Sequence, residues 1–262
     1  MPLLSHPARA YLKHLFTAGN RHHVHSPFVF ALVMQALRKQ PPEEGCAPIE
    51  RLRAILQRRT DTITVADLGA GPRRNRGPVR RVGQIARTAL KPRHQAEQLA
   101  RIARHFKPRT IVELGTSLGL TTLYLARAVP DARVYTMEGC PATAALAQDH
   151  FNQAGTGNIT LHLGPFKEQL PQVLAAVDRL DFAYIDGHHA ASPTLDYFEQ
   201  CLGKAHNDSV FVIDDIHWSA GMEQAWSAIQ AHPRVSVTID LFHFGLAFLR
   251  REQPREHFRL RY

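Results

Sequence analysis

The sequence predicts an α/β fold with a seven-stranded, mostly parallel sheet, an antiparallel last strand and an N-terminal helical cap. From about residue 109 onward, apolar strand patterns alternate with helical ones, which indicates βαβ units. The last two strands are separated only by about residues 242–244, too few for a crossover helix, so they are expected to pair as an antiparallel hairpin. The hydrophobic content of 44% is ample for a buried core.

The first hundred residues follow a different pattern and are predicted to be mainly helical. Ser26 and Pro27 suit the N-cap and first position of a helix over the apolar run 28–37, which Pro41 and Pro42 would stop. We therefore divide the chain into a cap, 1–100, and a ligand-binding domain, 101–262. Within the cap, further helices are expected at 49–59, 79–89 and 94–106, and a short strand at 63–65.

The second part of the chain carries the predicted sheet. Strands are expected at 110–114, 133–137, 159–163, 182–185, 210–213, 235–241 and 245–249. Helices fit between them at 120–129, 142–154, 166–177, 194–202 and 221–232. No stretch approaches the roughly 20 apolar residues of a membrane span, and no signal peptide or C-x-x-C pair is seen, so we expect a cytoplasmic protein without a membrane partner.

The stretch VELGTSLGLTTLYLA at 112–126 reads as a strand, a glycine turn and a helix. Gly115 and Gly119 let the backbone turn sharply and approach a ligand. The G-x-x-x-G spacing, preceded by Glu113, argues against a dinucleotide pyrophosphate and for a cationic or zwitterionic ligand. The alternative is a turn without a ligand. A second glycine turn, DLGAG at 67–71, lacks a clean helix start. It is predicted to be a loop of the cap that lies near a second ligand.

Charge is distributed unevenly along the chain, whose formal net charge is +9. Residues 51–109 hold sixteen Lys and Arg against three acidic residues, whereas residues 110–215 hold five against thirteen. An arginine-rich cap docking on an acidic domain explains this pattern, and so does a surface for phosphate or nucleic acid. We favour docking, because the basic segment lacks the aromatic residues that stack bases.

Polar residues follow each predicted strand at the edge where an open α/β sheet binds ligands. Glu138 is placed to accept hydrogen bonds from ribose hydroxyls, and Phe166 can face a base. Asp186 could instead begin a turn, and Glu138 could cap a helix. The five turns are Gly115-Thr116-Ser117, Glu138, Gly164-Pro165-Phe166, Asp186-Gly187-His188-His189, and Asp214-Asp215 with His217-Trp218 just beyond.

These segments together resemble the class I S-adenosylmethionine (SAM)-dependent methyltransferases, most closely the catechol-type O-methyltransferase branch. The resemblance covers roughly residues 94–250 and rests on VELGTSLGLTTLYLA, YTMEG, FNQAG, NITLHLGPFKEQLP, LDFAYIDGHH and VFVIDDIHW. The family's Rossmann-like sheet also ends in a reversed strand. HSPFVF at 25–30 and DDIHWS at 214–219 resemble a bacterial group described only as SAM-dependent methyltransferases.

The resemblance implies where SAM binds. Glu113 and the glycine turn would surround the methionine part, Glu138 would hold the ribose, and Phe166 and His188 would flank the adenine. The cofactor-binding residues expected in this way are Glu113, Gly115, Thr116, Ser117, Gly119, Glu138, Gly139, Phe166, Asp186 and His188.

In the metal-dependent branch, the ligands of the divalent ion map to Asp186, Asp214 and Asp215. Three carboxylates suit Mg²⁺, whereas recruitment of His188, His189 or His217 would favour Mn²⁺, Fe²⁺ or Zn²⁺. The family's catalytic lysine aligns with His189, which would act as general base beside Asp186. In the alternative without a metal, Asp214 and Asp215 cap the next helix and His189 is a loop residue.

The sequence thus favours SAM-dependent O-methylation of a small hydroxylated acceptor, with or without a divalent ion. Two alternatives remain open: an RNA-modifying methyltransferase that uses the arginines of residues 73–93, and a SAM-binding protein without turnover. A nicotinamide-dependent oxidoreductase is disfavoured because the phosphate fingerprint is missing. The histidines at 22, 23 and 25 are not expected to bind metal, because no thiol or carboxylate completes a site. Acceptor identity and oligomeric state are not encoded in a recognisable motif.

Overall fold

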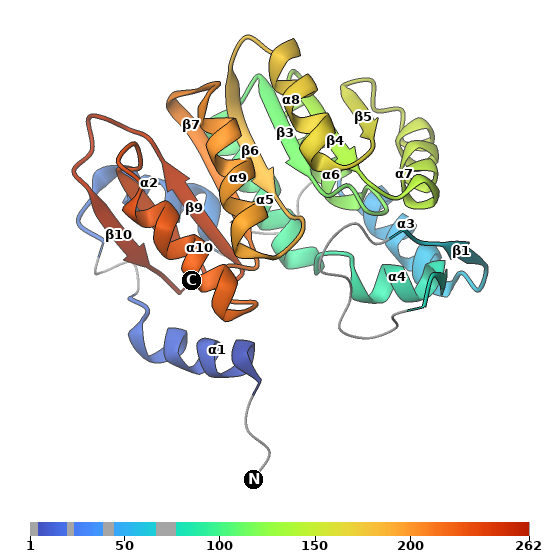
Figure 1. Cartoon of the computed structure of the whole chain (residues 1–262), viewed down its shortest axis with the longest axis horizontal. Helices are drawn as coiled ribbons and strands as arrows, with labels where there is room; N and C mark the ends of the chain where they lie inside the picture. The colour runs from blue at the N-terminus through green and yellow to red at the C-terminus, as the bar shows by residue number, and fades with distance from the viewer. Residues whose placement is uncertain (1–4, 20–23, 39–44, 67–76, 262) are drawn as a thin grey trace. The chain divides into compact units, whose positions relative to one another are not determined.

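A computed structural model describes residues 5–19, 24–38, 45–66 and 77–261 (Figure 1). The chain folds into two compact units, one made of residues 1–38 and 174–262 and the other of residues 39–173. The predicted DLGAG loop at 67–71, the arginines at 73, 74 and 76, and the histidines at 22 and 23 lie outside the described residues. The predicted division of the chain near residue 100 stays a prediction.

The unit of residues 39–173 is built on three parallel strands, all of which confirm predicted ones. The pairing runs β3 to β4 and β4 to β5, with Val112 opposite Tyr135 and Met137 opposite His162. Apolar residues of helix α6 are buried almost throughout, as expected for a helix packed on a sheet. The elements are α5 Arg93–Phe106, β3 Thr110–Leu114, α6 Leu120–Ala128, β4 Arg133–Glu138, α7 Pro141–Ala154, β5 Ile159–Leu163 and most of α8 Phe166–Ala176.

Four further elements of this unit come from the predicted cap: α3 Ala47–Arg58, β1 Thr62–Thr64, β2 Val79–Arg81 and α4 Val82–Thr88. The helix predicted over 79–89 is correct only from Val82 onward. Its first three residues instead pair with β1 in an antiparallel ladder, with Ile63 opposite Arg80. Valine and two arginines carry no helical apolar spacing of their own, so a backbone partner decides their conformation.

A buried hydrogen bond joins helix α3 to helix α6. The Tyr124 hydroxyl donates to Glu50 Oε1 at 2.8 Å, and Arg53 Nε donates to both oxygens of the same carboxylate at 3.0 Å. Burial, followed by the contact with Glu50, raises the pKa of Tyr124, so its hydroxyl stays a donor. Part of the predicted cap is therefore fixed to the sheet-bearing part of the same unit by one carboxylate.

The unit of residues 1–38 and 174–262 carries five strands, in the order β10-β8-β9-β7-β6. Strand β9 is antiparallel to both β7 and β8, which confirms the predicted hairpin at residues 235–249. Strand β10 was not predicted, and it pairs in parallel with β8. Among the described residues, β3 to β10 are therefore eight mostly parallel strands, one more than the seven predicted. The strands are β6 Leu180–Ile185, β7 Ala205–Asp214, β8 Val237–Asp240, β9 Phe244–Phe248 and β10 Glu256–Arg259.

Helices α9 and α10 of this unit lie side by side against its strands (Figure 1). The predicted N-cap at Ser26 is confirmed, because its hydroxyl accepts from Val29 N at 3.4 Å. None of the described helices combines the length and the apolar composition that a bilayer crossing requires. The helices are α1 His6–Thr17, which was not predicted, α2 Pro27–Leu32 with the π-helical turn η2 Val33–Leu37, α9 Ala191–Leu202 and α10 Ala220–Ala231.

Two glycines of the unit of residues 39–173 provide a matched test of packing at a turn. Gly119 and Gly155 both have left-handed backbone, at φ of 81° and 62°. A Cβ on Gly119 would lie 2.6 Å from the Phe151 ring, whereas a Cβ on Gly155 would meet nothing within 4 Å. We expect Gly155→Ala to cost about 1–2 kcal/mol of unfolding free energy and Gly119→Ala about 1–3 kcal/mol more, measured by chemical denaturation. Equal losses in the two variants would show that Phe151 does not restrict the turn.

Candidate cofactor and acceptor sites

Glu138, the last residue of β4, ties together the turns that follow three strands. Its Oε2 accepts from Ser117 N at 2.7 Å, and its Oε1 accepts from Cys140 N at 2.9 Å. Its backbone carbonyl accepts from Gly164 N at 2.9 Å. Because these donors belong to the turns after β3, β4 and β5, one residue sets the spacing of all three turns, which include the predicted cofactor residues Thr116, Gly139 and Phe166.

The turn after β3 has an unusual backbone that its sequence explains. Gly115, Ser117 and Gly119 all have positive φ, at 109°, 49° and 81°. Glycine adopts this conformation without a steric penalty, but serine does not. The hydrogen bond from Ser117 N to the charged Glu138 offsets that cost, so the strained turn depends on the carboxylate.

Glu113, predicted to face the ligand, is fully buried. Its Oε2 accepts from Thr122 Oγ1 at 2.5 Å and from Thr136 Oγ1 at 2.7 Å. The Thr136 hydroxyl also lies 2.6 Å from Thr116 Oγ1. Sequence reasoning missed both threonine partners, although Thr136 stands opposite Glu113 in the strand register and is a polar residue in an apolar strand. Glu113 thereby fixes β3 to β4 and α6 directly beneath the glycine turn.

The environment of Glu138 changes its acidity. Burial raises the pKa of the carboxyl, and the hydrogen bonds from Cys140 N, Ser117 N, Thr143 and Gly139 lower it, with a raised pKa as the result. Keeping this carboxyl charged at neutral pH therefore costs the folded unit free energy. A cost of that kind is typical of a binding site rather than of a surface turn.

In the other unit, Asp186, His189 and Asp214 come together at the ends of β6 and β7. Their ligand atoms all lie within 4.8 Å of one another. The Tyr184 hydroxyl donates to Asp186 Oδ2 at 2.8 Å, and His189 Nε2 lies 3.6 Å from Asp186 Oδ1. Tyr184 was missed by sequence analysis, but it stands two residues before Asp186 and therefore on the same face of the strand.

The two histidines after β6 point to different partners. His188 and His189 both have left-handed backbone, with φ of 64° and 38°. His188 Nδ1 is hydrogen-bonded to the Tyr197 hydroxyl at 3.0 Å, whereas the His189 ring lies 6.1 Å from the Trp218 ring, centre to centre. The turn thus separates the predicted adenine-flanking residue from the predicted base.

Asp215, the third predicted metal ligand, does not join the Asp186, His189 and Asp214 group. Its backbone turns at φ of 49°, where its N–H donates to His243 O at 2.9 Å. Neither Asp214 nor Asp215 caps the next helix, because the N-cap of α10 is Ser219, which accepts from Met222 N at 3.2 Å. Two carboxylates and one imidazole suit Mn²⁺, Fe²⁺ or Zn²⁺ better than Mg²⁺, which prefers oxygen ligands alone.

The same part of the chain matches known methyltransferases. Residues 112–216 match the family model described as a methyltransferase domain. The chain is 30% identical over 126 residues to a catechol O-methyltransferase of Niastella koreensis, covering 47% of this chain and 56% of that protein. It is 28% identical over 130 residues to a catechol O-methyltransferase of Mycobacterium tuberculosis, covering 49% and 57%. The chain spans about half the length of the curated relatives it matches.

The fold agrees with this match. An O-methyltransferase from Bacillus cereus, solved in complex with SAH, is 19% identical with a TM-score of 0.56, over 84% of this chain and 96% of that one. TomG, an O-methyltransferase from Streptomyces achromogenes solved in complex with SAM, is 23% identical with a TM-score of 0.53, over 62% and 82%. Over the matched segment, the chain is similar to class I, catechol-type O-methyltransferases. Its α/β fold is that of the Rossmann-like methyltransferases.

Three of the described arginines of residues 73–93 make contacts within their own unit. Arg80 Nε donates to Gly77 O at 3.0 Å, Arg87 donates to Gln57 O, and Arg93 pairs with Glu97 at 2.8 Å. These contacts join cap residues to one another, so the predicted docking on the acidic domain and the surface for nucleic acid both stay predictions.

The raised pKa of Glu138 predicts how stability depends on pH. Because the folded state binds the proton more tightly than the unfolded state, stability falls as pH rises from the ordinary glutamate pKa, about 4.3, through the raised value. Glu138→Gln removes this titration, so its free energy of unfolding should fall less than that of wild type over the same interval. Urea denaturation at a series of pH values measures the difference. Parallel curves for the two proteins would contradict it.

Proposed function

We propose that the protein transfers the methyl group of SAM to a hydroxyl oxygen of a small acceptor. The observation that carries the proposal is that Glu138 joins the three turns that the family resemblance assigns to the cofactor. These turns lie within the segment that matches the methyltransferase domain. The similarity to proteins named catechol O-methyltransferases supports a small hydroxylated acceptor.

For cofactor binding, each residue contributes in a different way. The Glu138 carboxylate keeps lone pairs beyond those used by Ser117 N and Cys140 N, and these can accept ribose hydroxyls. Gly115 and Gly119 let the cofactor approach the backbone. Glu113 acts from beneath, through its bond to Thr136, and adds a negative charge that favours a ligand carrying an ammonium and a sulfonium group.

For methyl transfer, an acceptor hydroxyl must lose its proton as its oxygen attacks the methyl carbon. The O–C bond forms while the S–C bond of SAM breaks, and S-adenosylhomocysteine leaves. We assign the proton to His189, which would pass it to solvent, while Asp186 at 3.6 Å stabilises the imidazolium. Tyr184 holds Asp186 in place for this task.

Asp186 and Asp214 would also hold a divalent ion, and their donor set fits one. Such an ion, when bound, would make the acceptor hydroxyl more acidic. His189 Nε2 can serve as base or as ligand, but not as both in one complex, because each task needs the same lone pair. We propose the first of these for His189.

The cofactor assignment is tested by titration calorimetry with S-adenosylhomocysteine. We expect Glu138→Ala to weaken binding at least tenfold, because it removes the acceptor for the ribose and the anchor of the turn. Glu168→Ala, at an exposed glutamate of the same unit, is the control and should bind as wild type does. Undiminished binding by Glu138→Ala would refute the assignment.

The assignment of His189 is tested by activity against a panel of catechols in His189→Gln. If His189 is the base, kcat falls and the pH profile of kcat loses one limb. Added Mn²⁺ or Mg²⁺ then does not restore kcat. The control is His94→Gln, at an exposed histidine. Rescue by added metal would instead make His189 a ligand. Wild-type activity that survives exhaustive chelation would exclude a requirement for the divalent ion. SAM binding without methyl transfer to any acceptor would favour the non-catalytic alternative.

A further inference from the structure

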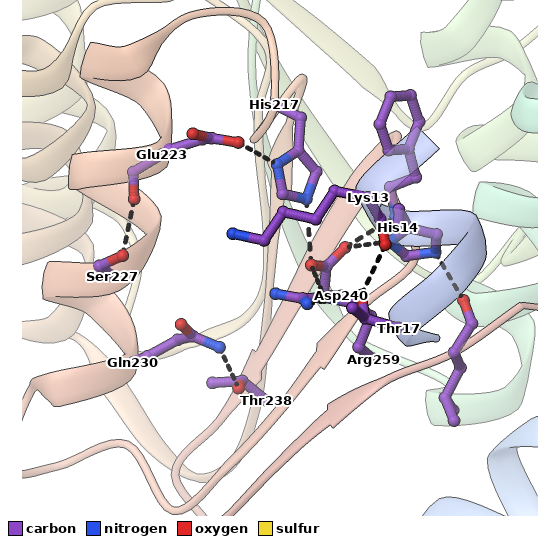
Figure 2. Close-up of polar contacts among 12 residues, drawn as sticks. Lys13, His14, Thr17, His217, Glu223, Ser227, Gln230, Thr238, Asp240 and Arg259 are labelled. Atoms are coloured by element: carbon purple, nitrogen blue, oxygen red, sulfur yellow. Dashed lines mark hydrogen bonds and ion pairs between the residues drawn. The ribbon is translucent and has the colours of Figure 1, made fainter. Parts of the chain in front are cut away.

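A second cluster of histidine and carboxylate side chains lies in the unit of residues 1–38 and 174–262, outside the residues proposed for methyl transfer. It joins His14 of α1, His217 of the turn after β7, and Asp240 at the end of β8 (Figure 2). Their side chains are only 5%, 10% and 2% exposed. Three polar residues this far apart in sequence and this deeply buried need a physical reason to converge.

In both histidines, the ring nitrogen that points away from Asp240 faces a hydrogen-bond acceptor. His14 Nε2 lies 3.2 Å from the backbone carbonyl of Leu260, and His217 Nδ1 lies 2.8 Å from Glu223 Oε1 (Figure 2). These oxygens accept but do not donate, so each outer nitrogen can carry a proton and donate it to the oxygen that it faces. In the neutral rings, the two inner nitrogens then present lone pairs.

Both inner nitrogens point at the same carboxylate. His14 Nδ1 lies 3.4 Å from Asp240 Oδ1, and His217 Nε2 lies 3.0 Å from Asp240 Oδ2. Among the described residues, His14 Nδ1 is buried without a hydrogen bond. The nitrogen and oxygen ligand atoms all fall within 4.8 Å of one another. When both rings are neutral with protons on their outer nitrogens, the converging lone pairs repel one another. A proton on His217 Nε2, which would make the 3.0 Å hydrogen bond to Asp240 Oδ2, or a bound cation relieves this repulsion.

We propose that His14, His217 and Asp240 form a binding site for a transition-metal ion of the Zn²⁺ type. Two imidazole nitrogens and one carboxylate oxygen are ligands that Zn²⁺ commonly takes, with a fourth position left for water. The outer contacts match those of metal-bound histidines, which donate their other N–H to a carboxylate or a backbone carbonyl. This site shares no residue with the Asp186, His189 and Asp214 group.

The carboxylate that completes the site is itself held in place. Phe242 N donates to Asp240 Oδ1 at 2.9 Å, and Arg259 Nε donates to Oδ2 at 3.1 Å. With neutral histidines, the charges of Asp240, Glu223 and Arg259 sum to −1, so a divalent cation is attracted rather than repelled. These donors orient the ligand before the ion arrives, which lowers the entropic cost of binding.

The ion would fasten the N-terminal helix to its unit. Helix α1 buries only Ala10 and His14, and its Phe16 is 88% exposed, so apolar packing holds it weakly. Polar contacts also link it to its unit, such as the bond from Arg259 Nη1 to Thr17 Oγ1 at 2.8 Å and the contact of His6 with Glu223 at 3.4 Å. The Tyr11 ring lies 4.9 Å from the Phe242 ring, centre to centre. A metal bridge from residue 14 to residues 217 and 240 would add the missing cross-link.

The test is a titration of Zn²⁺, and of Co²⁺ with detection of its visible absorption, into the full-length protein after removal of metal by a chelator. Besides any ion that the Asp186 group takes up, we expect a site that is lost in His14→Asn and retained in the double variant Asp186→Asn/Asp214→Asn. Glu223→Gln, which leaves the three ligands intact, should weaken binding 10–100-fold. His206→Asn is the matched control and should bind as wild type does, since the His206 ring contacts one carboxylate, Asp181 at 2.8 Å, and accepts from Asp208 N at 3.2 Å.

Two further measurements keep the result unambiguous. Circular dichroism of each variant identifies any that has failed to fold, and X-ray absorption of the wild-type Zn²⁺ complex counts imidazole ligands without any substitution. Two imidazoles support the proposed site, whereas the Asp186 group would supply one. Absence of Zn²⁺ and Co²⁺ binding by the wild type, or binding that is lost in the Asp186→Asn/Asp214→Asn variant and unchanged in His14→Asn, would overturn the proposal.

Discussion

The partly buried carboxylate of Glu138 is the constraint on which the proposed cofactor site depends. Three turns of one unit converge on this residue: Ser117 N and Cys140 N donate to its carboxylate, and Gly164 N donates to its backbone carbonyl. A charged acceptor makes such bonds short and strong, but it must be taken out of water to do so. The turn at Ser117 gains a shape that a neutral residue could not hold, and the fold accepts a carboxyl whose pKa is raised by burial.

Three other buried or partly buried acids, Glu113, Asp186 and Asp240, are stabilised by different donors, suited to different tasks. Glu113 is held by threonine hydroxyls and serves as a link between elements. Asp186 has a tyrosine hydroxyl and a nearby imidazole, which leaves it able to share a proton or a cation. For Asp240, burial raises the pKa, but the neighbouring His14 and His217 rings and the bond from Phe242 N outweigh burial and lower the pKa. The donors around each acid therefore indicate whether it links, catalyses or binds.

The sequence predicted strands that are buried on both faces, because long apolar runs such as those of β6 and β7 have no other stable placement. It did not predict β10 or β2, since Glu256, His257 and the arginines of β2 carry no apolar pattern and their conformation depends on the neighbouring strand. Helix α1 was missed for the same reason: its amphipathic signal is interrupted by charged residues, and its placement depends on polar contacts with residues near 240 and 260.

Positions of site residues were more predictable than their partners. The rule that ligands bind beyond the carboxyl ends of strands located Glu138, Asp186 and Asp214. It could not show that Asp215 departs from Asp214 or that His217 pairs with Asp240, because adjacent side chains diverge according to a backbone angle that the sequence does not display. The pairing of His14 with Asp240 spans most of the chain, and local patterns carry no information about it.

Backbone strain gives independent support to these assignments. Among the described residues, six other than glycine have positive φ, and all except Lys107, which ends α5, lie in turns directly after strands: Ser117, His188, His189, Asp215 and Phe242. Each such residue costs about 1–2 kcal/mol, and the fold retains strain where a particular side-chain direction is needed. Three of these turns carry the residues assigned to cofactor, base and ion. The fourth, at Phe242, places the ring that stacks on His217 and the N–H that binds Asp240. The proposed site of His14, His217 and Asp240 therefore shares a strained neighbouring turn with the proposed cofactor site and with the Asp186 group.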